Sequence, residues 1–410
     1  MKNASILTGL VLLAAAAHAG VGDLTDIVCQ PGQAISARAV SAYGQWTWAK
    51  PAADSGTVNP HAMVVTLRSK SLTVKAAIDS RKADENTPNV IRLDFTGKGK
   101  FGEDAVVALK VTGIILGQGS FHRSFGPATL QVQRGDKTIP VTVQGEYYRS
   151  DSYRNVQLHL GRARQGRCAF GEKVCAVRLV DGNSNLTVGD VARARRSART
   201  GAVSFPGADT LLIDTGDGTF KDAKSVRKVF CGQPVLLDGV WYEVKISPDE
   251  TKISAAKADV KAARIKIDHD SWQGIWLADK HVLSLSGGKE PVEVPAGAYV
   301  IAQYRQTVKD ARGRAGELQR SDLETYTGKA KVFQVPAGKT TEIAVGSPMT
   351  AGLAVRQSQG EVVFALDLKD ASGATIGYLT LPGGRRPNAP KIRVLDSSDK
   401  LIHAGKMEFG

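Results

Sequence analysis

Long apolar segments and helical periodicity are both scarce in this chain of 410 residues. Beyond residue 19, no stretch approaches the roughly 18 consecutive apolar residues that a transmembrane helix requires. No long amphipathic run supports strands and helices alternating around a parallel sheet. A phosphate-binding loop, a dinucleotide fingerprint and a serine nucleophile elbow are also absent from the sequence, which therefore gives no support to the enzyme classes that use them.

The first residues carry an export signal. Lys2 supplies a positive charge, residues 6–17 form an apolar run, and Ala17-His18-Ala19 is a cleavage site of the small-x-small type. We expect residues 1–19 to be a signal peptide. The mature chain would then begin near Gly20 and be secreted or periplasmic in a bacterium.

Cysteine is rare, with four residues in the whole chain: Cys29, Cys168, Cys175 and Cys231. An exported protein meets oxidising conditions in which disulfides persist. Cys168 and Cys175 flank a turn-like segment, so the preferred pairing joins them across a hairpin and leaves Cys29 for Cys231, although other connectivities stay open. Zinc is the weaker interpretation, because no Cys-x-x-Cys pair or histidine cluster accompanies them.

Positive charge dominates the chain. The 54 Lys and Arg residues exceed the 40 Asp and Glu residues, which gives a net charge of +14. This excess predicts attraction to an anionic cell-envelope polymer or polysaccharide. A candidate anion-binding cluster consists of Arg193, Arg195, Arg196 and Arg199. A solvated basic face is the alternative, and no aromatic residues are interleaved for base stacking, so no specific nucleic-acid motif is present.

Short alternating segments and frequent glycines indicate an all-β fold. Apolar and polar residues alternate over 63–67, 106–111, 129–133, 139–144 and 240–246, and the chain contains 43 glycines. We expect two or three sandwich-like or barrel-like domains with short helical turns, one of them over residues 191–198.

A change of texture near residue 270 predicts a domain boundary. We expect an N-terminal β domain over 20–268 and a C-terminal region over 269–410. A break near 160 would divide the N-terminal domain into two units. In the latter, Val292–Gly297 and Phe333–Gly338 repeat a strand that ends in a Pro-x-Gly turn. The region resembles the immunoglobulin-like or transthyretin-like sandwiches of uncharacterised secreted bacterial proteins.

One loop has the spacing of a calcium site. Asp181, Asn183 and Asn185 stand at alternate positions and Asp190 follows, a pattern that resembles the start of an EF-hand or dockerin loop. It departs from that pattern at Leu186, where a glycine is needed, and it lacks the glutamate at position twelve. The residues predict either a Ca²⁺ loop borne by strands or a turn whose side chains cap their own backbone.

A second acidic loop contains Asp214, Asp217 and Asp222. It repeats the pattern of Asp94-Phe95-Thr96-Gly97, and the two copies predict equivalent strand-loop-strand units. Lys98 takes the place of Asp217 in the first copy, so only the second copy keeps the charge for a cation.

The segment Leu211-Leu212-Ile213-Asp214-Thr215-Gly216 also resembles the active-site loop of aspartic peptidases. The resemblance implies that Asp214 is the catalytic acid of a pair of carboxyl groups that share a proton. The chain has no second Asp-Thr-Gly, so a homodimer or a degenerate partner at Asp94 would be required.

Aromatic rings are few but could stack on sugars. Core and interface packing is the alternative, and the candidates are Trp46, Trp48, Tyr147, Tyr148, Tyr153, Trp272 and Trp276. The sequence as a whole predicts a secreted or periplasmic structural or binding protein with cation-stabilised loops, and an aspartic peptidase is the alternative.

Overall fold

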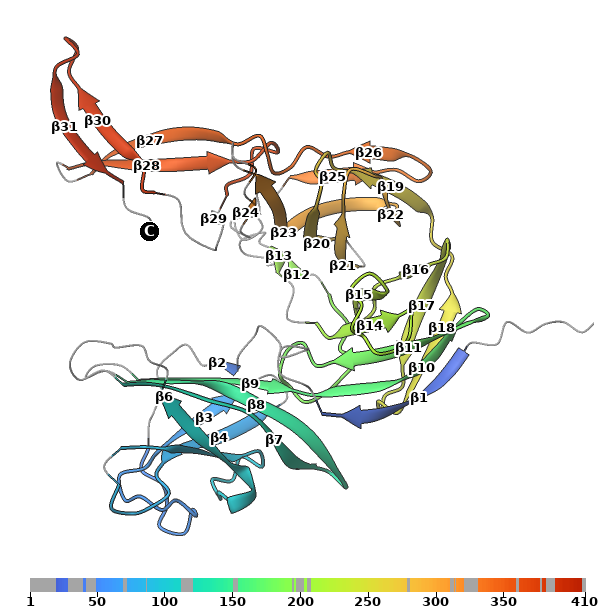
Figure 1. The fold of residues 1–410 in the computed structure, drawn as a ribbon, viewed down its shortest axis with the longest axis vertical. Helices are drawn as coiled ribbons and strands as arrows, with labels where there is room; N and C mark the ends of the chain where they lie inside the picture. Colours follow the sequence, from blue (N-terminus) through green and yellow to red (C-terminus); the bar gives the residue numbers. More distant parts are fainter. Residues whose placement is uncertain are drawn as a thin grey trace, which may run out of the picture.

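The fold is built from β-sheets, as the alternation predicts. The computed structural model describes residues 20–28, 40–41, 49–68, 72–85, 87–111, 121–149, 154–193, 195–196, 203–204, 208–278, 281–309, 313, 315–320, 331–358, 361–376, 378–380 and 388–407. Over these ranges the only helical element is a 3-10 turn, η1 (Glu103–Ala105). None of the described helices is therefore long and apolar enough to cross a membrane. The sheets form three groups that follow one another along a curve (Figure 1).

The first group is one curled sheet of eight strands, in the order β2-β9-β8-β7-β6-β5-β4-β3. Its strands are β2 (Val40–Ser41), β3 (Met63–Arg68), β4 (Thr73–Asp79), β5 (Val90–Asp94), β6 (Val106–Val111), β7 (Phe121–Arg134), β8 (Lys137–Arg149) and β9 (Arg154–Gly161). The end strands β2 and β3 contact each other, so the sheet curls into a barrel-like shape. Its core contains Leu67, Val74, Ile91, Val141 and Leu158, all fully buried.

The second group is another antiparallel sheet of eight strands, in the order β15-β14-β11-β10-β1-β18-β17-β16. Its strands are β1 (Gly20–Ile27), β10 (Ala163–Phe170), β11 (Lys173–Val180), β14 (Thr210–Asp214), β15 (Val226–Phe230), β16 (Val235–Leu237), β17 (Val240–Ile246) and β18 (Lys252–Lys257). Strand β1 lies at its centre, because Leu24–Ile27 pairs with β10 and Gly20–Asp23 pairs with β18. A short ladder of β12 (Arg195–Arg196) and β13 (Val203–Ser204) stands between β11 and β14 in the chain.

The third group is a sandwich. One layer contains β20 (Trp272–Leu277), β21 (Val282–Gly287), β23 (Gly297–Lys309), β24 (Ala315–Arg320), β25 (Val332–Val335) and β29 (Tyr378–Thr380). The other contains β19 (Ala262–Lys266), β22 (Val292–Pro295) and β26 (Thr340–Glu342). The core between them includes Ile265, Trp276, Val294, Tyr299 and Tyr304.

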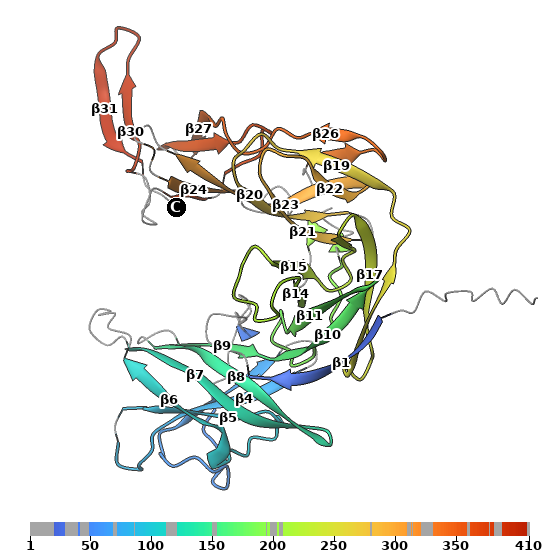
Figure 2. The same ribbon diagram turned by 45° about the vertical axis from the view of Figure 1, so that its right-hand side comes forward.

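Two hairpins complete the chain. β27 (Thr350–Ser358) pairs with β28 (Glu361–Lys369), and β30 (Lys391–Leu395) pairs with β31 (Leu401–Lys406). Both lie at the far end of the curve, away from the first sheet (Figure 1), and the turned view shows β30 and β31 projecting from it (Figure 2).

The sheets change near the expected boundaries. The first sheet ends at Gly161 and the second resumes at Ala163. β19 pairs with β22 and β26, so the third group begins at Ala262, slightly before residue 268. The expected helical turns over 191–198 do not form in the part of this segment that the structure describes. Residues 191–193 are irregular, and Arg195 and Arg196 form β12.

The predicted disulfide Cys168–Cys175 is not formed. The two residues do lie directly opposite each other on β10 and β11, as the hairpin prediction requires. The hairpin closes at Phe170 and Lys173 around two turn residues, which places the cysteines at a hydrogen-bonded position of the ladder, where opposed side chains are farther apart. Cys231 is also a free, buried cysteine, so its predicted bond to Cys29, which lies outside the described residues, is not formed either.

Candidate functional site

The loop after β11 is closed by its own hydrogen bonds. Asp181 is fully buried, and its carboxylate accepts the backbone N–H groups of Asn183 (3.0 Å) and Leu186 (2.8 Å). Asp190 Oδ2 accepts the side-chain amides of Asn183 at 2.9 Å and Asn185 at 2.6 Å. These two amides present N–H groups to the carboxylate, whereas a calcium ion requires their oxygens. The geometry favours the self-capped turn over the calcium loop.

Leu186 makes the sharp turn for which the calcium-loop pattern requires a glycine. Its φ is +64°, in the left-handed region, yet its side chain is buried in the core of the first sheet. Ser184 Oγ, from the same loop, donates to Leu160 O at 3.1 Å on β9. The loop therefore fastens the second sheet to the first.

Arginines complete this joint. Arg162, between β9 and β10, donates to Leu186 O at 2.7 Å and forms ion pairs with Asp26 of β1 and Glu250 of the β17–β18 turn. Arg134 at the end of β7 also donates to Leu186 O. One loop carbonyl thus accepts hydrogen bonds from two cationic side chains.

Asp209 lies beneath the same loop. It is fully buried, and its two carboxylate oxygens accept the backbone N–H groups of Gly182 and Asp190, each at 2.8 Å. Desolvation, reinforced by the nearby charge of Asp181, raises the pKa of Asp209 to about 8. Desolvation also raises the pKa of Asp181 to about 6, against the hydrogen bonds that it accepts.

The loops that follow β5 and β14 have the same construction. Asp214 ends β14, and its carboxylate accepts Gly216 N at 2.8 Å, Ser225 Oγ at 2.9 Å and Phe220 N at 2.9 Å. Asp94 ends β5 and accepts Thr96 N at 2.8 Å and Gly99 N at 2.5 Å. In each copy one buried carboxylate holds the loop that follows its strand.

This geometry gives no support to a peptidase at Asp214. Asp94 and Asp214 lie in different sheets. Burial tends to raise the pKa of Asp214, but the hydrogen bonds from Phe220, Gly216 and Ser225 outweigh it and the pKa is lowered. A shared-proton pair needs a second carboxyl group alongside and one raised pKa.

The remaining candidate ligands are exposed. Asp217 accepts Thr219 N at 2.9 Å, and Asp222 accepts Lys224 N at 2.9 Å. Among the residues that the structure describes, no group of three acidic, histidine or cysteine side chains could hold a metal ion. Calcium binding at these loops stays a prediction.

The cysteines and arginines singled out in the sequence are partly described. Burial raises the pKa of Cys168 to about 11 and also raises the pKa of Cys175 and of Cys231, so these thiols stay protonated at neutral pH. Arg193 is exposed, and the backbone of Arg195 pairs with Ser204 in β12 and β13. The side chains of Arg195 and Arg196 and all of Arg199 lie outside the description.

Of the aromatic candidates, Trp272 and Trp276 are buried in the sandwich core, which confirms the packing interpretation for both. Trp46 and Trp48 lie outside the described residues. Tyr147 lines a pocket in the first sheet, described next.

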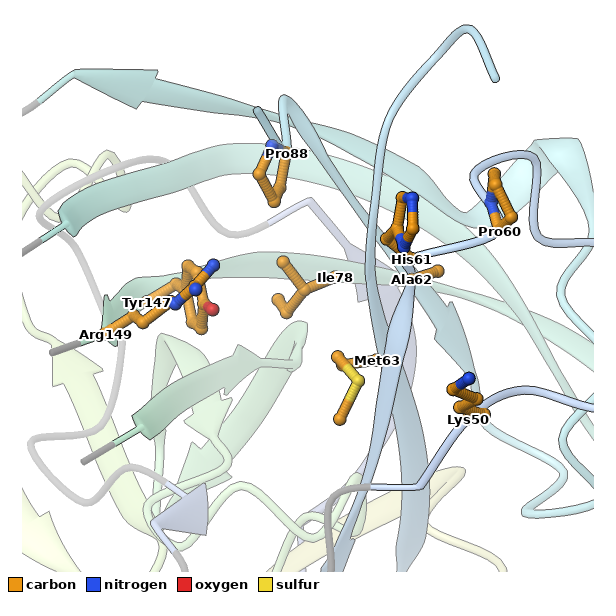
Figure 3. Close-up of a pocket in the computed structure, with 9 residues that line it drawn as sticks. All are labelled: Lys50, Pro60, His61, Ala62, Met63, Ile78, Pro88, Tyr147 and Arg149. Atoms are coloured by element: carbon orange, nitrogen blue, oxygen red, sulfur yellow. The ribbon is translucent and has the colours of Figure 1, made fainter. Parts of the chain in front are cut away.

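A cavity of about 380 Å³ opens at the end of the curled sheet. It is lined by Lys50, Pro60, His61, Ala62, Met63, Ile78, Pro88, Tyr147 and Arg149. Ile78 lies between Tyr147 and Arg149 on one side and His61, Ala62 and Met63 on the other (Figure 3). Ala62, Ile78 and Tyr147 are buried and form an apolar floor.

The described lining of this cavity is basic. Lys50, His61 and Arg149 are exposed, and no acidic residue is among the lining residues that the structure describes. Asp79, next to Ile78, is buried and bonded to Arg92 at 2.7 Å. An anion entering the pocket therefore meets basic groups above an apolar floor, the combination that orients a small ligand.

Strand curvature assembles this pocket from distant segments. β3 and β4 form one end of the sheet and β8 lies near the other, so His61, just before β3, and Arg149 line one pocket only because the sheet curls. No local motif joins these positions, and sequence reasoning singled out only Tyr147. No known protein family, curated protein or solved structure matches the chain.

Proposed function

We propose that this is a secreted or periplasmic binding protein, and that its pocket in the first sheet takes an acidic sugar unit of a cell-envelope polysaccharide. The observation that carries the proposal is the lining of the cavity. Among its described lining residues, Lys50, His61 and Arg149 are basic and no carboxylate is present. The export signal and the net charge of +14 agree with an anionic partner outside the cytoplasm.

The pocket suits a sugar acid better than a bare inorganic anion. Its floor includes the ring of Tyr147 and the side chain of Ile78, which can pack against the C–H face of a sugar ring. A cavity of about 380 Å³ is at the lower end of the size range of small-ligand sites. The basic groups would then pair with the carboxylate of the sugar.

Calorimetric titration with an oligogalacturonate, and with a neutral oligosaccharide of equal length, tests the proposal. We expect the acidic sugar to bind, the neutral sugar to bind at least tenfold more weakly, and added salt to reduce the difference. Arg149→Gln should weaken binding of the acidic sugar about tenfold, because one charged hydrogen bond to the carboxylate is lost.

Arg193→Gln is the matched control, since Arg193 is an exposed arginine that does not line the pocket. Unchanged affinity in this variant would assign the effect to Arg149. Loss of binding in Arg193→Gln alone would move the site to the arginine cluster, and equal affinity for both sugars would refute the proposal.

The sequence predicts that cations stabilise the acidic loops, whereas the hydrogen bonds argue against it, and a melting experiment decides between the two. Because Asp181, Asp190 and Asp214 already accept several hydrogen bonds each, we expect the melting temperature to be the same in calcium as in EGTA. An increase with calcium that Asp181→Ala reduces would instead establish the ion at this loop.

A further inference from the structure

The β27–β28 hairpin is an amphipathic ribbon. Cross-strand register pairs Leu353 with Leu366 and Val355 with Phe364, so these four side chains share one face. Leu353, Val355 and Leu366 are 53%, 58% and 36% exposed. Most of the exposed large hydrophobic side chains in the described ranges lie between Met349 and Ile402. A two-stranded ribbon with an open apolar face is marginally stable by itself.

The outer edge of β27 is open as well. Leu368 O accepts Ile376 N at 2.8 Å, so the backbone groups of Leu368 point away from β27. By alternation, β27 bonds to β28 through Gly352, Ala354 and Arg356. The N–H and C=O groups of Leu353 and Val355 therefore point outward, and no strand in the described part of the chain pairs with them.

We propose that a second copy of this chain pairs with that edge, β27 against β27 in antiparallel orientation, about a twofold axis at Ala354. In this register Leu353 lies opposite the partner's Val355, and the outward backbone groups of both strands meet. The result is a four-stranded sheet whose apolar side chains are continuous across both copies. Any register shifted by one residue would turn the two apolar faces to opposite sides.

Charge on the other face fits this register. Arg356 lies opposite the partner's Gly352, which has no side chain, and within each hairpin Gly352 pairs with Asp367. An arginine can thus extend over the glycine to the carboxylate of the partner's Asp367, and symmetry makes two such pairs. Asp367 now meets Lys369 of its own chain at 3.4 Å and keeps an oxygen for a second cation.

The β27–β28 hairpin has no net charge, so two copies can approach each other there without electrostatic repulsion. Residues 350–369 contain two basic and two acidic residues, whereas the whole chain has a net charge of +14. Two copies therefore meet through neutral ribbons while their basic bodies stay apart.

Cysteine cross-linking of the full mature protein tests the site directly. Ala354 lies on the axis at a non-hydrogen-bonded position, where opposed side chains are close enough for a disulfide. We expect Ala354→Cys to give a covalent dimer in a glutathione buffer. Ala365→Cys is the matched control, because Ala365 is paired with Ala354 in the same hairpin and lies one strand farther from the axis. Cross-linking of the control alone, of both equally, or of neither would overturn the proposal.

A charge exchange tests the register by sedimentation, without any cross-link. Arg356→Asp should weaken the dimer about tenfold, because two attractive pairs become repulsive. The double variant Arg356→Asp with Asp367→Arg should restore association. A double variant as weak as the single one, or a wild-type protein that stays monomeric across the concentration series, would contradict the proposal.

Discussion

At the scale of single residues, the buried carboxyl groups of Asp181 and Asp209 make stability depend on pH. Desolvation raises the pKa of Asp209 to about 8 and that of Asp181 to about 6, whereas an unfolded aspartate titrates near its ordinary value of about 4. Between these values the folded state holds protons that the unfolded state has released. Stability therefore falls as the pH rises through this window.

We expect the free energy of unfolding, measured in urea with EGTA present, to decrease between pH 6 and pH 8. The slope should be about 1.4 kcal/mol per pH unit near pH 7, where Asp181 has largely released its proton and Asp209 still holds one in the folded state. Asp209→Asn should flatten the profile over this range. A wild-type profile that is level or rises from pH 6 to pH 8 would contradict the burial argument.

Leu186 shows why the loop's form was hard to predict from its residues. The calcium-loop pattern requires glycine at the position of Leu186, because the backbone there is left-handed. Leu186 nevertheless adopts this conformation, with φ +64°. That conformation costs about 1–2 kcal/mol. Burial of its side chain in the neighbouring core contributes about 2 kcal/mol and offsets the cost. The offset depends on a core that lies far away in the sequence.

At the scale of elements, the loops that follow β5 and β14 depend on one aspartate each. Asp94→Ala and Asp214→Ala should each destabilise the protein by about 2–4 kcal/mol, because several backbone donors lose a buried acceptor. Urea unfolding of the two variants checks this.

Asp217→Ala is the control, since Asp217 is exposed and accepts only from Thr219 of its own turn. Its effect should stay below about 1 kcal/mol. If Asp214→Ala proved as mild as Asp217→Ala, the common role of the two strand-end aspartates would have to be abandoned.

Strands were the most predictable elements. The alternating segments at 63–67, 106–111, 129–133, 139–144 and 240–246 all lie within strands, because one buried face imposes a period of two. The hairpin of Cys168 and Cys175 was also foreseen, since a short polar turn fixes its register. Pairing between distant strands, such as β1 with β10 and β18, could not be predicted, because no local sequence pattern indicates it.

At the scale of the whole molecule, Arg162 stands where the chain passes from the first sheet to the second, and it binds the carbonyl of Leu186, whose side chain packs in the first core. Arg162→Met should destabilise the protein by about 2 kcal/mol, because Asp26 and Glu250 lose their shorter ion pairs and keep only Arg164 at 3.7 Å and Arg134 at 3.6 Å. We expect calorimetry to show the thermal transition separating into two.

Lys173→Met is the comparison, because Lys173 pairs with Asp238 at an exposed position within the second sheet. It should cost less than about 1 kcal/mol and leave the transition undivided. A single sharp transition in Arg162→Met would show that the sheets are coupled by other contacts.

The pocket belongs to this scale too, which is why the sequence did not reveal it. In the sequence, no motif distinguishes Lys50, His61 or Arg149 from other basic surface residues. They become a site only when the sheet closes and brings β3 and β4 to β8. Net charge predicted an anionic partner but could not say where that partner binds.

The central place of β1 has a consequence for the order in which the chain can be completed. The strand is made before the curled sheet, yet both of its neighbours, β10 and β18, come after that entire sheet. The curled sheet can close as soon as its own strands emerge, whereas β1 must wait for residues up to Lys257. Such distant pairing is slow to form. Until then both edges of β1 are unpaired, so this strand is the part of the second sheet that is open longest to pairing with a wrong strand.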